Sequence, residues 1–161
     1  VPITYSRCRR LTGFVSKKEL ENVPLLSNWM RFLYCLFLDR DNVRSGLKTI
    51  LTAIEQVKNG ISIFIFPEGT RNKGEELSVL PFHDGSFKIA EKTGCPVIPV
   101  SINNSVQILE AHFPIIRKTH VVLEYGEPIY PNTLDKEAKK QLGTYCHDLI
   151  EATIKKNAAL V

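Results

Sequence analysis

The chain has 161 residues, 43% of them apolar and 24% charged, so it is long enough to bury a sizeable core and is neither disordered nor fibrous. Its formal net charge is +4, and residues 1–40 carry the whole excess: seven Lys/Arg stand against three Asp/Glu, while the other 121 residues hold fourteen of each sign. This asymmetry favours an anionic substrate or an anionic membrane surface. A nucleic-acid partner is not expected, because no nucleic-acid reader motif accompanies the charge.

The cysteines indicate a reducing compartment. They are far apart and include no C-x-x-C pair and no His spacing suited to zinc: Cys8, Cys35, Cys95 and Cys146. We therefore predict small buried thiols, no disulfide framework and no metal site. No secretory signal peptide is recognisable.

The first forty residues predict a strand and an apolar helix. Residues 11–16 suit a short strand followed directly by Lys17, and Pro24 suits the first turn of a helix. The helix and its flank carry the most apolar set in the chain: Leu25, Leu26, Trp29, Met30, Phe32, Leu33, Tyr34, Leu36, Phe37 and Leu38. The uninterrupted run, Phe32 to Leu38, is too short to span a bilayer. Two interpretations stay open: the stripe is core, or part of it lies in a membrane interface with Trp29 and the basic residues at headgroup level.

A strand–helix–strand unit is predicted next. Leu36–Leu38 suits a brief strand ending before Arg40, and Val43–Lys58 is amphipathic, with one apolar face (Leu47, Ile50, Leu51, Ile54 and Val57) and a stop at Asn59-Gly60. Ile61–Phe66 is an apolar run that suits a strand buried on both faces, as in a parallel sheet. A right-handed crossover between these strands would bring Arg40 and residues 68–71 to one edge of the sheet.

The run at Ile61 ends at Pro67, which lacks the N–H that a sheet ladder needs. A polar tetrad follows, Glu68, Gly69, Thr70 and Arg71, in which the glycine allows a turn that a side chain would obstruct. Open α/β sheets usually bind ligands at this carboxyl edge.

The remaining elements complete an α/β fold: a single domain with a mixed, mostly parallel sheet flanked by helices. They are a loop at 72–84, a helix beginning at 84–86 and ending near Lys92 with Gly94 closing it, strands at Val97–Ile102 and Val121–Tyr125, and a helix from Thr133, its expected N-cap, to about Lys156. Pro99 within the Val97–Ile102 strand indicates an edge or a bulge.

Three basic residues follow predicted strands and suit an anion. Arg40 and Arg71 can each donate two parallel hydrogen bonds to a phosphate or carboxylate, and Lys17 adds a third charge. Glu68 can orient Arg71 or accept hydrogen bonds from substrate hydroxyls. The alternative is an ordinary surface salt bridge, worth about 0–1 kcal/mol.

Four blocks in order resemble the glycerolipid acyltransferase family, and most closely its 1-acylglycerol-3-phosphate (lysophosphatidate) acyltransferase group. They are F-P-E-G-T-R at Phe66–Arg71, F-V-S-K-K-E-L at Phe14–Leu20, L-F-L-D-R at Leu36–Arg40 and V-I-P-V-S-I at Val97–Ile102. The glycine that usually opens the L-F-L-D-R block is absent here. Pro81–Ala90 is loosely similar to a family linker, with His83 in place of a lysine.

The resemblance implies acyl transfer from acyl-CoA or acyl carrier protein to lysophosphatidate, giving phosphatidic acid in phospholipid biosynthesis. By position, it implies that Arg40, Arg71 and Lys17 hold the phosphate, that Glu68 contacts the glycerol part, and that Gly69 and Thr70 shape the turn. Val97–Ile102 would lie near the acyl-binding region. The thioester is a co-substrate and no cofactor is implied; the protein would be membrane-associated on the cytoplasmic face.

The family's catalytic base is a histidine in an H-x-x-x-x-D block, and no histidine of this chain has that spacing to an aspartate. His83-Asp84 is a poor substitute, since nothing places it at an acceptor hydroxyl. We therefore expect residues 1–161 to be an amino-truncated acyltransferase domain, with the dyad upstream of Val1, and to be inactive alone. Two alternatives stay open: a non-catalytic phosphate- or lipid-binding module, and an acyltransferase with another acceptor, such as glycerol-3-phosphate.

Overall fold

A computed structural model describes residues 2–39, 42–72 and 77–161, so Arg40 lies outside the described residues. The chain divides into two compact units, which are described one at a time. The first comprises Val1–Phe66 and Gly85–Cys95, and the second comprises Pro67–Asp84 and Pro96–Val161. The extent of the acyltransferase domain stays a prediction.

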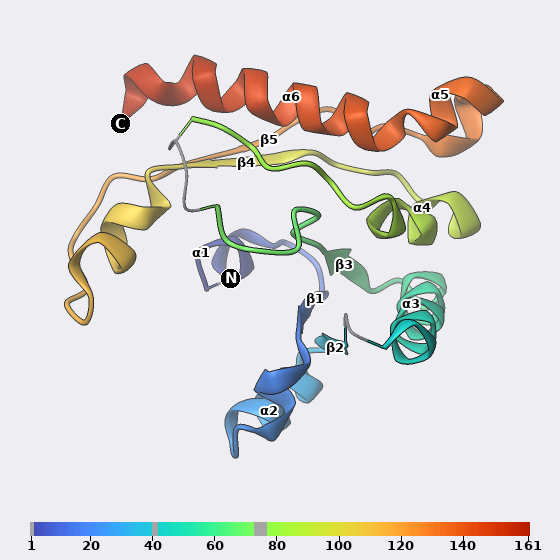
Figure 1. The fold of residues 1–161 in the computed structure, drawn as a ribbon, viewed down its shortest axis with the longest axis horizontal. Coiled ribbons are helices and arrows are strands. Elements are labelled where there is room, and N and C mark those ends of the chain that lie inside the picture. Colours follow the sequence, from blue (N-terminus) through green and yellow to red (C-terminus); the bar gives the residue numbers. More distant parts are fainter. Residues whose placement is uncertain (1, 40–41, 73–76) are drawn as a thin grey trace. The chain divides into compact units, whose positions relative to one another are not determined.

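The first unit contains a parallel sheet of three short strands: β1 (Thr12–Lys17), β2 (Leu36–Leu38) and β3 (Ser62–Phe64), in the order β2-β1-β3 (Figure 1). Lys17 is level with Leu38, and Phe14 with Phe64. The expected parallel α/β arrangement is confirmed, and the carboxyl ends of all three strands meet at one edge.

The central strand is β1 rather than the run at Ile61–Phe66. Thr12 and Phe14 of β1 are buried, whereas none of residues 61–66 is buried. The expectation of a strand buried on both faces is therefore wrong for this run. The reason is that β3 pairs on one side only among the described residues, and its ladder ends two residues before Phe66.

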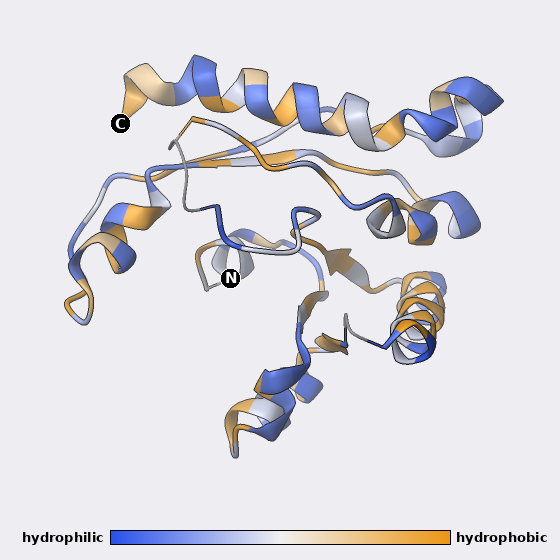
Figure 2. Ribbon diagram, in the orientation of Figure 1, coloured by the Kyte–Doolittle hydropathy of each residue, from blue (hydrophilic) through white to orange (hydrophobic). Residues whose placement is uncertain are grey.

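The described part of the first unit contains the α-helices α1 (Pro2–Arg7), α2 (Leu26–Phe32), α3 (Val43–Lys58) and α4 (Lys88–Thr93). The predicted bounds of α3 are confirmed; the Asn42 side chain caps it by accepting from Ser45 N. Ala53 of α3, Leu36 of β2 and Ile89 of α4 form one buried cluster. Apolar residues cover much of α3 (Figure 2), although Leu47 and Leu51 are exposed, so only part of the predicted face is core.

Helix α2 divides its apolar residues between core and solvent. Met30 is buried against Phe14 and Cys35. Leu25, Trp29 and Phe32 point outward, with 83%, 55% and 81% of their surface exposed. Met30 is therefore a core residue, as one interpretation expected. The interpretation that the whole stripe is core is wrong, because these three side chains are exposed.

The second unit contains an antiparallel pair, β4 (Val100–Asn103) with β5 (Val122–Tyr125), and the helices α5 (Lys136–Lys140) and α6 (Leu142–Asn157). Helix α6 lies along β4 (Figure 1). Pro99 stands just before β4, as its missing N–H requires. The single helix expected from Thr133 is instead broken near Gln141, and the side chain of Asp135, rather than Thr133, caps α5.

Short 3-10 helices occupy several connections: Lys18–Asn22, Asp84–Phe87, Ser105–Ile108, Glu110–His112, Pro131–Thr133 and Ala158–Leu160. Within the described ranges, none of the helices is both long enough and apolar enough to cross a membrane.

Candidate functional site

The tetrad, Glu68–Arg71, begins a loop in the second unit, which we call the tetrad loop (described residues 67–72 and 77–83). Two hydrogen bonds join the arms of this loop. The Pro67 carbonyl accepts from His83 N at 3.0 Å, and Asn72 Nδ2 donates to the Ser78 carbonyl at 2.8 Å. The first contact joins residues 16 positions apart and encloses the tetrad; the second joins residues 6 positions apart, beyond the tetrad. The loop is therefore held by specific polar bonds rather than by a sheet ladder.

Glu68 takes part in the same closure. Its Oε2 accepts from Leu80 N at 2.9 Å, and the side chain is half-buried. Glu68 and Arg71, which are both described, form no ion pair, so the salt-bridge interpretation of this pair is wrong. Glu68 Oε1 has no hydrogen-bond partner among the described residues and is available as an acceptor. The anchoring amide of Leu80 was not predicted, because no sequence pattern marks a backbone donor 12 residues away.

Gly69 turns the chain between these two side chains. It is buried and has a φ of 71°, a conformation that a side chain would strain. The predicted turn is confirmed. Thr70 and Arg71, directly after it, are exposed. The turn therefore leaves a guanidinium in solvent three residues beyond an anchored carboxylate.

Lys17 ends β1 in the first unit and is also exposed. Neither Lys17 nor Arg71 forms an ion pair with any described residue. The neighbouring Lys18 does: its Nζ lies 2.6 Å from Asp39 Oδ2, and this bond raises the pKa of Lys18. Because Arg40 is not described and Lys17 and Arg71 belong to different units, their predicted convergence on one phosphate stays a prediction.

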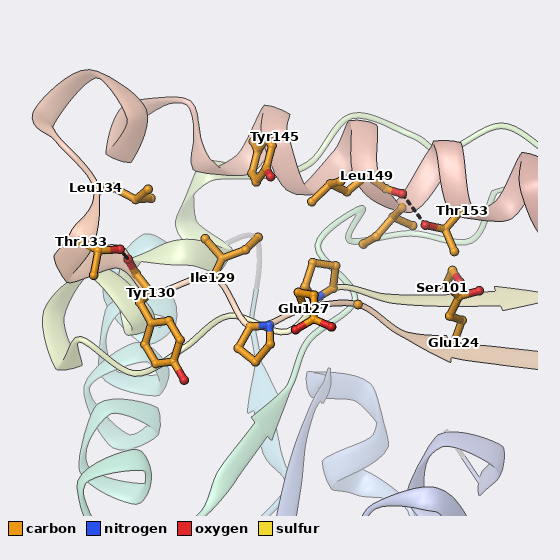
Figure 3. A pocket seen from close by; sticks show the side chains of 14 residues that line it. Ser101, Glu124, Glu127, Ile129, Tyr130, Thr133, Leu134, Tyr145, Leu149 and Thr153 are labelled. Atoms are coloured by element: carbon orange, nitrogen blue, oxygen red, sulfur yellow. Dashed lines mark hydrogen bonds between the residues drawn. The ribbon is translucent and has the colours of Figure 1, made fainter.

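A cavity of about 550 Å³ opens in the second unit between the β4–β5 pair and α6 (Figure 3). Tyr145, Leu149 and Thr153 of α6 lie on one side of it, and Ser101 and Glu124 on the other. Ser101 is 2% exposed, and its Oγ has no hydrogen-bond partner among the residues that the structure describes. Tyr145 and Leu149 line this opening and are exposed.

Two of the thiols are held in the protonated form. All four cysteines are free; Cys35 and Cys146 are buried, as predicted, whereas Cys8 and Cys95 are only partly buried. Burial raises the pKa of Cys35, and that of Cys146 to about 11, so both are protonated at neutral pH. In the part of the chain that the structure describes, no three His, Cys, Asp or Glu side chains gather as metal ligands would.

The family model described as "Acyltransferase" matches residues 3–103. The 1-acyl-sn-glycerol-3-phosphate acyltransferases of Haemophilus influenzae and Escherichia coli are 33% and 31% identical over 89% of this chain. That of Saccharomyces cerevisiae is 29% identical over 87% of the chain. The chain spans about half the length of these relatives, covering 58%, 57% and 46% of them.

A solved structure is similar as well: the 1-acyl-sn-glycerophosphate (LPA) acyltransferase PlsC from Thermotoga maritima. It is 31% identical, with a TM-score of 0.74 over 92% of this chain and 58% of that one. The family match covers β1, β2, β3, the tetrad loop and β4, which are the parts that carry the motif blocks. The chain belongs to the acyltransferase family.

Proposed function

We propose that the whole protein transfers a fatty acyl group from a thioester donor, acyl-CoA or acyl carrier protein, to 1-acylglycerol-3-phosphate, giving phosphatidic acid. The observation that carries this proposal is the unbroken F-P-E-G-T-R block, built as a closed loop with an anchored Glu68 and an exposed Arg71. The relatives named for this activity support it. No cofactor is proposed, because ester formation from a thioester needs no redox or Lewis-acid partner.

Arg71 binds the acceptor phosphate, assisted by Lys17 and Arg40. A guanidinium pairs two parallel N–H groups with two phosphate oxygens, and Arg71 has no ion pair with a described residue to give up. Glu68 accepts from a glycerol hydroxyl through Oε1, since Oε2 is already engaged by Leu80 N. Gly69 and Thr70 shape the turn that separates these two groups.

In the transfer, the acceptor oxygen forms a bond to the acyl carbonyl carbon and the carbon–sulfur bond breaks. The hydroxyl proton goes to a general base and then to the leaving thiolate. We propose that this base is the histidine of an H-x-x-x-x-D block upstream of Val1, because no histidine in residues 1–161 has that spacing. His83 is a poor candidate: its backbone N closes the loop on Pro67 and its side chain is exposed.

The membrane surface is the proposed source of the lipid acceptor, contacted on the cytoplasmic face through α2. Leu25, Trp29 and Phe32 are exposed together on this short segment. The excess positive charge of residues 1–40 complements anionic headgroups. Trp29→Ser should reduce the fraction of the protein that sediments with anionic vesicles. Leu160→Ser, which changes an exposed apolar residue elsewhere, is the matched control. An equal loss of sedimentation in both variants would contradict a membrane contact through α2.

Acyl transfer by the complete protein tests the proposed function. The acceptors to compare are 1-acylglycerol-3-phosphate, glycerol-3-phosphate and a lysophospholipid with a larger headgroup. Turnover should be fastest with the first. A preference for glycerol-3-phosphate would reassign the acceptor. If the protein bound acceptors through their phosphate but turned over none of them, the alternative of a non-catalytic lipid-binding module would be supported.

A further inference from the structure

His147 of α6 contacts the tetrad loop from outside it. Its Nε2 lies 3.1 Å from the Val79 carbonyl oxygen, and its ring meets Phe82 edge-on, with centroids 5.2 Å apart. A carbonyl oxygen only accepts, so Nε2 must carry the proton in this bond. His147 and the loop belong to the same unit, and only 23% of the imidazole side chain is exposed.

The Val79 carbonyl and the Leu80 N–H are the two ends of one peptide plane. Such a plane is rigid, so fixing the direction of its carbonyl also fixes the direction of its N–H. His147 donates to one end at 3.1 Å, and Glu68 accepts from the other end at 2.9 Å. The imidazole and the carboxylate are therefore linked through a single rigid unit.

We propose that His147 is a positioning residue for the acceptor site: it orients the Val79–Leu80 peptide, which in turn holds the Glu68 carboxylate in place for the substrate. This inference rests on the role proposed above for Glu68. It adds a residue of α6, some 80 positions after the motif, to the machinery of the tetrad loop.

The surroundings of His147 favour its charged form. Nδ1 lies 3.0 Å from Asp148 Oδ1, and this hydrogen bond is the main reason that the His147 pKa is raised; Glu151, one turn along α6, adds to the shift. The loop residues that contact the ring, Val79 and Phe82, are uncharged. Neutral His147 carries one N–H, and the proposal requires it on Nε2, where it donates to Val79 while the bond to Asp148 is lost. The charged form makes both bonds and holds the peptide more firmly.

Two variants separate the hydrogen bond from packing. His147→Phe keeps a ring against Phe82 and removes both nitrogens. His147→Gln keeps an amide N–H near the position of Nε2 and removes the charge. Hydrogen exchange at the Leu80 amide reports the bond to Glu68 directly. Exchange at Val122 of β5, which pairs with Asn103 of β4, reports any general loosening of the unit. His120→Gln, at an exposed histidine, is the matched control.

In His147→Phe, the Leu80 amide should exchange about tenfold faster while Val122 is unchanged, and binding of 1-acylglycerol-3-phosphate to the chain should weaken about fivefold. His147→Gln should restore most of both. Unchanged Leu80 exchange in a folded His147→Phe, or failure of His147→Gln to restore exchange and binding, would overturn the proposal.

If His147→Phe does not fold, nitrogen NMR of the unsubstituted chain tests the proposal instead. It reports which ring nitrogen of neutral His147 carries the proton, and a proton on Nδ1 rather than Nε2 would overturn the bond to Val79. If the unsubstituted chain binds no 1-acylglycerol-3-phosphate, the proposed function fails, whereas the exchange result still decides whether His147 holds the peptide.

Discussion

The two units are stabilised in different ways. In the first, two apolar clusters pack around the sheet: Phe14, Met30 and Cys35 form one, and Leu36, Ala53 and Ile89 form the other. The polar side chains buried in this unit are hydroxyls, those of Thr4, Thr12 and Ser27. In the second unit, the β4–β5 pair and α6 bury amide side chains that make long-range hydrogen bonds. Asn103 donates to the Ile154 carbonyl at 2.8 Å, and Asn157 donates to Glu124 at 2.8 Å.

This difference bears on function. Apolar packing is non-directional and fills space, whereas a buried hydrogen bond fixes one arrangement of its partners. The tetrad loop belongs to the second unit and is closed by the same kind of bond. The part of the chain that presents Glu68 and Arg71 is thus organised by directed polar contacts between distant residues, and the parallel sheet is organised by packing.

Phe14→Ala should have the largest effect on stability. The ring is 1% exposed and stacks on Phe64 with centroids 5.2 Å apart, so truncation should cost about 3–5 kcal/mol of unfolding free energy. Urea unfolding followed by circular dichroism measures it, with the 78%-exposed Phe113→Ala as control. A loss below about 1 kcal/mol would mean that packing does not dominate the first unit.

Asn157→Ala should cost less, about 1–3 kcal/mol, because it truncates a buried side chain and removes the hydrogen bond that Asn157 Nδ2 donates to Glu124 Oε2. Asn157 is 1% exposed and helps to lower the pKa of Glu124, after Lys156, the larger cause. The same urea experiment applies, with the exposed Asn132→Ala as control. If Asn157→Leu were as stable as the unsubstituted chain, the polar bond would not be what holds the second unit together.

The His147–Asp148 bond should give the smallest effect, and it depends on pH. The pKa of His147 in the folded chain is raised above its ordinary value of 6.5. The stabilisation from the His147–Asp148 bond is therefore complete below about pH 6.5 and is lost as the pH rises through the raised pKa. Asp148 is 71% exposed, so solvent screens the bond and we expect about 0.5 kcal/mol. The stability difference between the unsubstituted chain and His147→Gln should be larger at about pH 5.5 than at about pH 8.5. A difference that grows with pH would contradict this assignment.

The same contrast explains what could be predicted from the sequence. The bounds of α3 follow from a 3.6-residue apolar period and an Asn-Gly stop, and β1 and β2 from short apolar runs, because local pattern and packing agree there. The burial of Ile61–Phe66 was mispredicted, since a pattern does not tell an edge strand from a central one. The break at Gln141 was missed because the apolar spacing continues across it.

In the site, the turn at Gly69 was predictable because only glycine adopts that backbone easily. The anchoring of Glu68 by Leu80, and of that peptide by His147, was not predictable. Each bond joins a side chain to a backbone group 12 or 68 residues away, and the backbone group carries no sequence signal. The sequence also did not tell whether Glu68 and Arg71, which are both described, would form an ion pair; in the structure they do not.

The central claim is that Arg71 binds the acceptor phosphate, and a pair of ligands tests it most directly. Dissociation constants of the chain should be measured by calorimetry for 1-acylglycerol-3-phosphate and for the matching monoacylglycerol, which lacks only the phosphate. Arg71→Ala should weaken the phosphate ligand about tenfold or more and leave the monoacylglycerol unchanged, whereas Arg117→Ala, at another exposed arginine, should change neither. Equal affinities of the unsubstituted chain and Arg71→Ala for the phosphate ligand, or equal losses for both ligands, would contradict the claim.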